Sequence, residues 1–583
     1  MKILLFTIKY FINEVIIILG FILLINNYIG TVDNTINADG IGYYDYLPSI
    51  IIHHDLLRKN DSILENPSLY NRINSIGAYV DYNNLKVNKY PCGTALLQLP
   101  FFTYAYLTSI PEGDINDGYQ RPFQKTVLYA AIFYLFLSIL FLKKILVLYD
   151  IKKHIIIFCQ IILVLATSVT HYSNYDAGFS HIYSLFAITA FIYFIKSFLK
   201  NKKINHFILA SVFGGLIFIL RQPNILIVLF VPFLAGSKEN LRIAFTTLFT
   251  NMRSFILSVV LFLGICSIQL ILWYSQTGDF FVYSYQGESF NFLDPQFYSI
   301  LFSYKKGLFV YTPVLLIATL SIIWFAYKKH FYLLFTWVAF FVLLTYVLSS
   351  WHAWHYACSY GLRAYIDYYT IFLIPFGLML DRIKKAPRLL IMILSLSTVP
   401  LNIIQTYQYK ELILHWYEMD KEKYWKVFLK TDDRFKELIW KRNYDANLYS
   451  TVSEINVGDI YSPKNSAATV FRIKSFDIPN FDKVSIIQVL IDNDYVENND
   501  TRILLDIKKT SDNYFYYWHE RNLIHFHQKN LNEWQTGLFN FEFNPITDNQ
   551  EKYISLVVKT GNQNENLKNV RLKFLSKTIA NNK

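Results

Sequence analysis

Two carboxylates stand close together at the point where an apolar run ends. Asp39 and Asp45 lie in the stretch NADGIGYYDYLP, which follows the run VIIILGFILLI. A carboxylate can remove a proton from a hydroxyl group when it lies within hydrogen-bond reach of the reacting oxygen. The structural alternative is helix capping, which aspartate performs often. We expect Asp39 and Asp45 to be catalytic, with Asp39 as the base, and Tyr43 and Tyr44 to contact the substrate.

Cationic and polar residues recur at the ends of the later apolar blocks. They occur in NKYPCGTALL, GFSHIYSLF, ILRQPN, SYKKGLFVYTP and SYGLRAYID. Ionisable residues at the membrane usually mark a site, and arginine can bind a phosphate through two hydrogen bonds. Each residue also has a structural alternative. The lysines could bind lipid headgroups, Arg221 could extend its side chain to the membrane surface, and His181 could cap a helix. We expect the following residues to bind substrate: Lys89, His181, Arg221, Lys305, Lys306 and Arg363.

The composition indicates what kind of molecule positions these residues. The chain has 583 residues, of which 53% are hydrophobic. Its apolar residues come in blocks of about twenty, the length that crosses a hydrocarbon core of roughly 30 Å. The pattern predicts a polytopic α-helical membrane protein with about eleven transmembrane helices between residues 10 and 406.

Charge predicts the orientation of these helices. Basic doublets concentrate in KKILVLYDIKKH, KSFLKNKKIN, YKKH and DRIKKAPR. Because cytoplasmic loops are enriched in lysine and arginine, we place these segments and the N-terminus inside. The first loop, 31–124, then lies outside, as do 275–308, 349–369 and everything after 407. The residue usage, rich in Asn, Lys and Ile, suggests a bacterial inner membrane.

The last third of the chain has a different pattern. Apolar and aromatic residues recur at helical spacing over 414–440, which is typical of a helix lying in the membrane interface. From about 465 the period becomes two, with Asn, Asp and Gly between the runs. We expect a transmembrane catalytic domain (1–410), an interfacial helix and linker (411–464) and an extracytoplasmic β-sandwich (465–583).

Several other functions are not supported by the residues. The net charge of +12 does not indicate nucleic-acid binding, because the basic residues lie between apolar blocks rather than on one face of a soluble domain. The pairs His53–His54 and His352/His355 give no convergent set of three or four metal ligands. No phosphate-binding glycine loop occurs. We expect no metal and no other cofactor.

Taken in order along the chain, these motifs resemble the GT-C class of membrane glycosyltransferases, which includes protein O-mannosyltransferases and lipid A aminoarabinose transferases. ADGIGYYDYLP stands where that class has its catalytic acid, and NKYPCGTALL resembles a later segment of the same loop. LRQPN resembles the class's Arg-Pro segment, and WHAWHYACSYGLRAYIDYY its tryptophan-rich stretch before an arginine. The class's Asp-Glu pair is absent, since Gly40 follows Asp39. The resemblance covers roughly 1–410 and leaves the β-domain without an assigned role.

The resemblance implies an inverting glycosyltransferase. Its partners would be a sugar donor linked to polyprenyl phosphate, an acceptor protein, lipid or glycan on the outer face, and the bilayer. A lipid-linked polysaccharide ligase or polymerase remains an alternative, as does a transporter with charges along its path. A membrane-anchored carbohydrate-binding protein is a fourth hypothesis.

Overall fold

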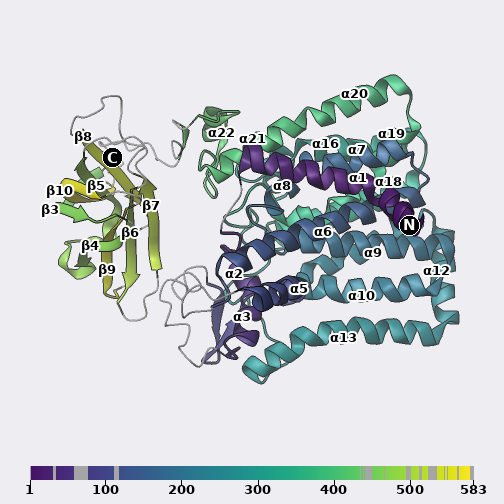
Figure 1. The fold of residues 1–583 in the computed structure, drawn as a ribbon, viewed down its shortest axis with the longest axis horizontal. Coiled ribbons are helices and arrows are strands. Elements are labelled where there is room, and N and C mark those ends of the chain that lie inside the picture. The colour runs from purple at the N-terminus through teal and green to yellow at the C-terminus, as the bar shows by residue number, and fades with distance from the viewer. Residues whose placement is uncertain are drawn as a thin grey trace. The chain divides into compact units, whose positions relative to one another are not determined.

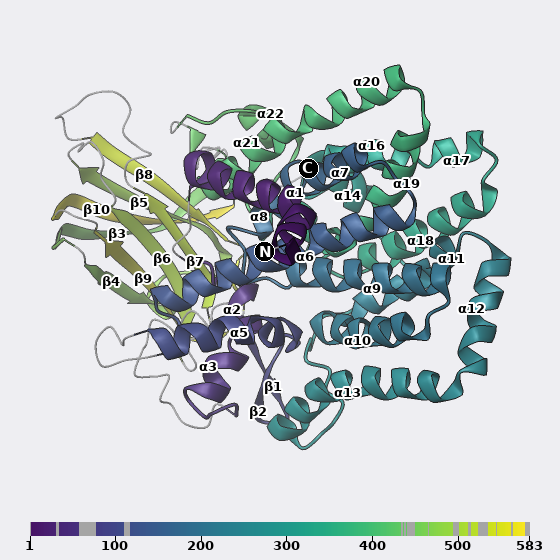
Figure 2. The ribbon, with the colours of Figure 1, turned by 45° about the vertical axis from the view of Figure 1, so that its right-hand side comes forward.

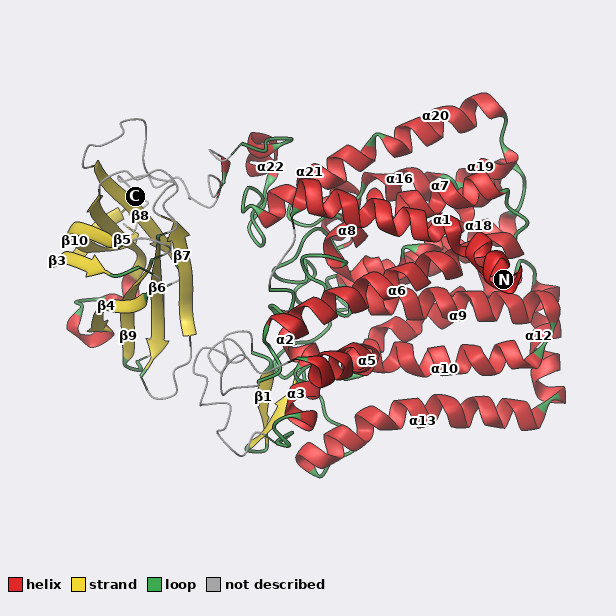
Figure 3. Cartoon of the chain, viewed as in Figure 1, coloured by secondary structure: helices red, strands yellow, loops and turns green. Residues whose placement is uncertain are grey.

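The structure is a computed structural model of the chain (Figure 1). It describes residues 2–30, 34–57, 77–109, 117–432, 435–436, 439, 449–464, 466–493, 501–510, 515–522, 535–543, 545–547, 549–560 and 564–577. The chain divides into two compact units, Met1–Thr431 and Asp432–Lys583. The first is helical and the second is built of strands (Figure 3).

The first unit contains the apolar helices. They are α1 (Lys2–Leu24), α6 (Arg121–Leu148), α7 (Lys153–Leu165), α9 (His181–Asn201), α10 (Ile204–Leu220), α11 (Val231–Ala235), α13 (Met252–Thr277), α16 (Pro313–Leu320), α17 (Ile323–Tyr327), α18 (Phe331–Ser349), α19 (Thr370–Arg382), α20 (Lys385–Leu396) and α21 (Thr398–Lys410). The shorter or more polar elements are α2 (Asp39–Tyr44), α3 (Tyr46–Ile51), α5 (Gly93–Thr108), α8 (Val169–Tyr172), α12 (Lys238–Thr250), α14 (Phe297–Phe302), α15 (Leu308–Tyr311) and α22 (Lys421–Val427). A π-helical turn, η1 (Ile25–Ile29), continues α1, and two 3-10 helices, η3 (Gln222–Phe230) and η4 (Arg363–Tyr368), precede α11 and α19.

Six helices of the described residues are long and apolar enough to cross a membrane, or seven if a pair bent by 118° counts as one span. The bent pair is Gln222–Ala235 with Lys238–Thr250, and three further apolar helices are shorter. A chain with this many apolar helices fits a multi-pass membrane protein. The number of about eleven crossings stays a prediction.

The helices of the first unit have two distinct ends. Helices α9, α10 and α13 run side by side, and α12 lies across one end of them (Figure 1). At the opposite end lie α2, α3 and the hairpin of β1 (Tyr79–Tyr82) and β2 (Leu85–Asn88) (Figure 2). The acidic stretch 37–48 is therefore at the end of the helices that is remote from α12.

Segments that the charge bias assigns to one side of the membrane also meet at one end of the helices. Lys200, in the last turn of α9, donates to the carbonyl of Leu148 at 2.7 Å. The amide of Lys152 donates to Asp381 at 3.2 Å, and Lys196 donates to the carbonyl of Leu234 at 2.9 Å. These basic segments thus gather near α12, away from the acidic stretch.

The second unit consists of two four-stranded antiparallel sheets. One has the order β3 (Tyr449–Ser462), β10 (Glu565–Lys577), β5 (Val484–Asn493) and β8 (Gln535–Glu542). The other has the order β4 (Ala467–Lys474), β9 (Lys552–Lys559), β6 (Arg502–Lys509) and β7 (Phe515–Asn522). Residues from both sheets, among them Val489, Leu505 and Phe574, share one hydrophobic core.

The segment between the units differs from the sequence-based expectation in two ways. Strand β3 begins at Tyr449, within the predicted linker 411–464 and before residue 465. Of the predicted interfacial helix 414–440, the described residues form an α-helix only over Lys421–Val427. Residues 433–434, 437–438 and 440 of that prediction lie outside the described residues, as do 58–76 and 110–116 of the first outer loop.

Candidate active site

Asp39 is the first residue of α2, and its side chain does not cap the helix. The N-cap position is Ala38, which makes no side-chain cap hydrogen bond. The start of α2 packs tightly on another backbone: a Cβ added to Gly40 would lie 3.1 Å from the carbonyl carbon of Gly178. Glycine at both positions allows the approach, which places Asp39 beside the segment that precedes α9. The capping interpretation of Asp39 therefore has no support in the geometry.

The Asp39 carboxylate is held by two donors from distant parts of the chain. Arg363 Nη1 lies 2.6 Å from Asp39 Oδ2, and Tyr90 Oη donates to Asp39 Oδ1 at 3.0 Å. The Asp39 side chain keeps 27% of its surface exposed, against 11% for Arg363. The acid is thus oriented by the protein and still accessible from outside it.

The pKa values of Arg363 and Tyr90 depend on their burial and on the negative charge of Asp39. Burial alone would lower the pKa of Arg363, but the Asp39 carboxylate and neighbouring tyrosines raise it overall, so the guanidinium remains charged. Burial raises the pKa of Tyr90 well above its ordinary value, and the Asp39 charge adds to this effect. Tyr90 is therefore a permanent hydrogen-bond donor to the carboxylate.

Tyrosine rings extend from this pair towards Lys89. The ring centroids of Tyr43 and Tyr90 are 4.7 Å apart, and those of Tyr90 and Tyr285 are 6.5 Å apart. Lys89 Nζ lies 5.0 Å from the centroid of Tyr285 and forms an ion pair with Glu288. Of the expected contact residues, Tyr43 thus packs on the Tyr90 ring that holds Asp39, whereas Lys89 is linked to it only through Tyr285.

A second ionic cluster surrounds Asp367, in η4. His181 Nδ1 lies 2.8 Å from Asp367 Oδ1, and Arg221 Nη1 lies 3.0 Å from Asp367 Oδ2. Asn224 also donates to Oδ2, at 2.7 Å. Asp367 is fully buried, so its negative charge is balanced within the protein. His181 and Arg221, both expected to bind substrate, are therefore engaged with a buried acid.

Phe179 lies between the two clusters. The guanidinium carbon of Arg363 is 5.2 Å from its ring centroid. The imidazole of His181 stacks nearly parallel to the same ring, with centroids 6.4 Å apart. Phe179 thus separates the Asp39–Arg363 pair from the Asp367 cluster by the width of one ring.

Asp45 and Tyr44 are placed differently from Asp39. Asp45 is 1% exposed; Tyr119 donates to its Oδ1 at 2.6 Å, and Tyr79 and Ser49 donate to its Oδ2. Tyr44 is buried and donates to the carbonyl of Gly118 at 2.6 Å. These contacts fasten the first loop, which indicates structural roles for both residues.

Lys305 and Lys306 follow α14 and have unequal surroundings. Lys306 is 2% exposed and donates to the backbone carbonyls of Ser359 and Trp416. Burial lowers its pKa to about 7, with the Arg363 charge contributing. Lys305 Nζ lies 4.6 Å from the ring centroid of Tyr417. The structure brings Lys306 within electrostatic reach of Arg363 and leaves Lys305 on an aromatic ring.

Sequence reasoning missed Asp367, Tyr90 and Phe179. A signal for Asp367 exists, because an acid at the start of the apolar stretch YIDYYTIFLIPF is costly in a membrane and usually has a cationic partner. Tyr90 stands directly beside the predicted Lys89, but nothing in a chain with 45 tyrosines distinguishes it. Among the described residues, no three His, Cys, Asp or Glu side chains gather in a way that would hold a metal ion.

No protein-family model and no curated protein matches the sequence. Among solved structures, the apo oligosaccharyltransferase of Archaeoglobus fulgidus is similar over 73% of this chain and 60% of its own, with 13% identity and a TM-score of 0.41. The oligosaccharyltransferase AglB of that organism, in complex with an inhibitory peptide and a dolichol-phosphate, is similar over 72% and 58%, with 9% identity and a TM-score of 0.38. Arabinosyltransferase EmbB from Mycobacterium smegmatis is similar over 97% and 64%, with 8% identity and a TM-score of 0.33.

The chain therefore spans 58% to 64% of the length of these structures. With TM-scores of 0.33 to 0.41, the likenesses do not establish a shared fold. The function has to follow from the residues of the site.

Proposed function

We propose that the protein is a GT-C-type inverting glycosyltransferase. It transfers a sugar from a polyprenyl-phosphate carrier to an acceptor hydroxyl at the outer face of a bacterial cytoplasmic membrane, with its N-terminus inside and its β-domain outside. The observation that carries the proposal is the Asp39–Arg363 pair. An accessible carboxylate and a guanidinium lie together at the end of a bundle of apolar helices. A lipid-linked substrate presents its phosphate and sugar at that depth.

Asp39 acts as the general base in this proposal. The acceptor hydroxyl gives its proton to the Asp39 carboxylate, and its oxygen attacks the sugar C1 from the face opposite the carrier. The C1–O bond to the phosphate breaks, its electron pair stays on the phosphate, and the anomeric configuration is inverted. A positioned base of this kind contributes roughly 10²–10⁴-fold to a rate.

Arg363 has two roles in this scheme. In the free protein it neutralises Asp39 across 2.6 Å. A lipid phosphate competes for the same guanidinium, because arginine binds phosphate through paired hydrogen bonds. When Arg363 turns to the phosphate, the Asp39 carboxylate is released from its ion pair and can accept the proton of the acceptor hydroxyl. Donor binding thus activates the base and stabilises the charge that develops on the leaving phosphate.

Transfer by the purified protein tests this proposal. The full-length chain is incubated with a pool of polyprenyl-phosphate sugars and a mixture of hydroxyl acceptors, and with nucleotide sugars in a parallel reaction. The product's anomeric configuration is read by NMR. We expect transfer from the lipid-linked pool alone, with inversion. Transfer from nucleotide sugars, retention at C1, or transfer of whole glycan chains only would contradict the proposal, the last in favour of a ligase.

A further inference from the structure

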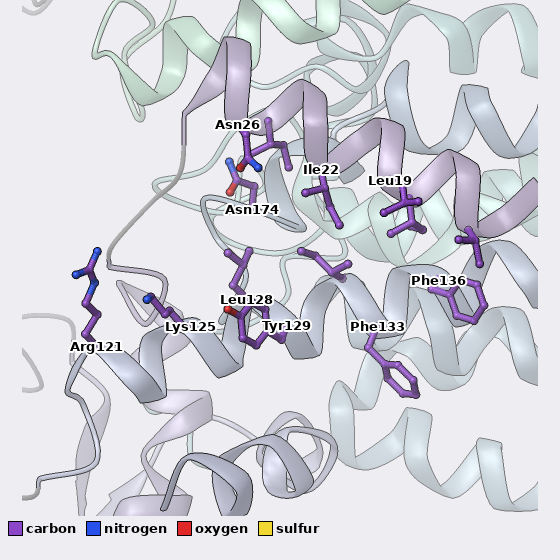
Figure 4. Close-up of a pocket in the computed structure, with 14 residues that line it drawn as sticks. Leu19, Ile22, Asn26, Arg121, Lys125, Leu128, Tyr129, Phe133, Phe136 and Asn174 are labelled. Carbon is purple, nitrogen blue, oxygen red and sulfur yellow. The ribbon is translucent and has the colours of Figure 1, made fainter. Parts of the chain in front are cut away.

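A groove runs between α1 and α6, and Asp39 is not among the residues that line it. Its volume is about 570 Å³. Leu19 and Ile22 of α1 line one side, and Leu128, Phe133 and Phe136 of α6 line the other (Figure 4). A groove of this volume and lining is within the range of small-ligand sites, which are mostly apolar.

The groove is polar at one end. Arg121 and Lys125, from the first turns of α6, lie at that end, and Phe133 and Phe136 lie towards the other (Figure 4). Both cations are exposed. An occupant therefore meets positive charge at one end and hydrocarbon along the rest, which matches an anionic headgroup on an apolar chain.

Asn174 adds an unsatisfied polar atom at the groove. Its side chain is fully buried and lines the groove beside Asn26 (Figure 4). Its Nδ2 donates to the carbonyl of Gly30 at 3.4 Å, while Oδ1 has no hydrogen-bond partner among the described residues.

The polar end of the groove adjoins the segment that leads into Asp39. Thr35 Oγ1 donates to the carbonyl of Gln124, next to Lys125, at 2.6 Å. Asn37 Nδ2 donates to the carbonyl of Tyr175, next to Asn174, at 3.3 Å. Residues 35–37 are thus bonded to both sides of the polar end and continue directly into α2. A headgroup at Lys125 is one short segment away from the base.

We propose that this groove binds the carrier lipid, with its phosphate on Lys125 and Arg121 and its polyprenyl chain along α1 and α6. This second lipid-binding site holds the donor before transfer or the polyprenyl phosphate product after transfer. The identity of the lipid rests on the proposed function, whereas the site itself rests on the groove and its charges.

Lipid binding to the full-length protein tests the inference. Native mass spectrometry measures the binding of undecaprenyl phosphate to wild type, Lys125→Gln, Leu128→Trp and Lys144→Gln. Lys144 lies on the same helix outside the groove lining, so Lys144→Gln is the matched control. Loss of a charge-assisted hydrogen bond weakens binding about tenfold. We expect that loss in Lys125→Gln, at least the same loss in Leu128→Trp, which fills the groove, and none in Lys144→Gln.

The competing outcomes are separable. Equal binding by wild type and Lys125→Gln would overturn the inference, as would displacement of undecaprenyl phosphate by an equal concentration of phosphatidylglycerol. Because Lys125 is exposed, its variant remains informative even if Leu128→Trp fails to fold. Wild type that transfers no sugar but still binds undecaprenyl phosphate through Lys125 would contradict the proposed function and support the lipid site in the groove. If wild type transfers sugar but binds undecaprenyl phosphate no more tightly than Lys125→Gln, the lipid site in the groove is contradicted and the proposed function is not.

Discussion

Three aspartates near one end of the helices have different environments, and the difference decides their roles. Asp39 is partly exposed and has Arg363 and Tyr90 as partners. Asp45 and Asp367 are buried and fully engaged by donors from the protein. A base must reach the acceptor, and of these three aspartates Asp39 is the most exposed, which supports the proposal that it is the base. The other two hold the first loop and η4 in place.

Removing the charge of Asp367 is expected to destabilise the protein. Asp367→Asn leaves the partly buried Arg221, whose side chain is 15% exposed, without its counter-ion, and breaking a pair that is largely removed from water costs about 3 kcal/mol. The apparent melting temperature of the purified protein should fall clearly. Arg221→Gln should cost less in the Asp367→Asn background than in wild type, because the two side chains interact directly. Additive losses would show that the pair is not coupled.

The buried Lys306 is expected to make stability depend on pH. Its pKa of about 7 lies below the value of about 10.4 for an unfolded lysine. Between these values the unfolded chain binds more protons than the folded one, so the free energy of unfolding rises with pH. Wild type should therefore gain more thermal stability between pH 7 and 9.5 than Lys306→Met, which cannot titrate. Parallel pH profiles would contradict the assignment.

At the scale of elements, a close crossing of α5 and α10 assembles the site. A Cβ added to Gly93 would lie 2.6 Å from backbone atoms of Ile219 and Leu220. Gly93 begins α5 shortly after Tyr90, and Arg221 follows α10 directly. The contact therefore fixes where Tyr90 and Arg221 stand relative to each other.

Gly93→Ala is expected to separate these two helices. Overpacking of this kind costs about 1–3 kcal/mol, and the shift of Tyr90 should reduce sugar transfer by more than the loss of folded protein explains. Gly264→Ala, in α13, is the matched control, since nothing lies within 4 Å of its added Cβ. The control should be as stable as wild type or slightly more so. Equal activity of the two variants would mean that the crossing does not position the site.

The sequence predicts the elements well where a periodic pattern has one strong cause. Apolar blocks indicate the long helices, and alternation indicates β4 to β10, whose apolar residues pack in or against one hydrophobic core. Strand β3 was missed. It lies at the edge of its sheet, and most of its residues are only partly buried or exposed, which is also true of β4, so burial does not explain the difference between the two strands. The sequence pattern did not distinguish helices α2 and α3 from the surrounding loop, because each has only six residues.

The candidate site was predictable in its location and in part of its membership. Hydropathy and charge place Asp39, Arg221 and Arg363 at the ends of apolar segments. The pairing of Asp39 with Arg363 and of Arg221 with Asp367 joins residues that are far apart along the chain. Such pairings depend on how the helices pack, and no local pattern in a single sequence shows which helices become neighbours. The buried setting of Asp45 was hidden for the same reason.

At the scale of the whole molecule, the two units are expected to respond to mutation independently. Phe574 is fully buried in the core of the second unit, so Phe574→Ala should cost about 3–5 kcal/mol there. Hydrogen exchange followed by mass spectrometry should show faster exchange in β5, β8 and β10 and unchanged exchange in α9 and α10. Phe476→Ala, at a residue 65% exposed, should change neither. Faster exchange in α9 would contradict independent cores.

The measurement that tests the central claim most directly is sugar transfer by Asp39→Asn. Its rate from a polyprenyl-phosphate sugar is compared with those of wild type and Asp45→Asn, after lipid binding has shown that each variant is folded. The proposed mechanism predicts that Asp39→Asn binds the lipid and loses roughly 100-fold or more in kcat. Asp45→Asn should lose stability and keep its kcat per folded molecule. Wild-type turnover by folded Asp39→Asn would contradict the assignment of the base.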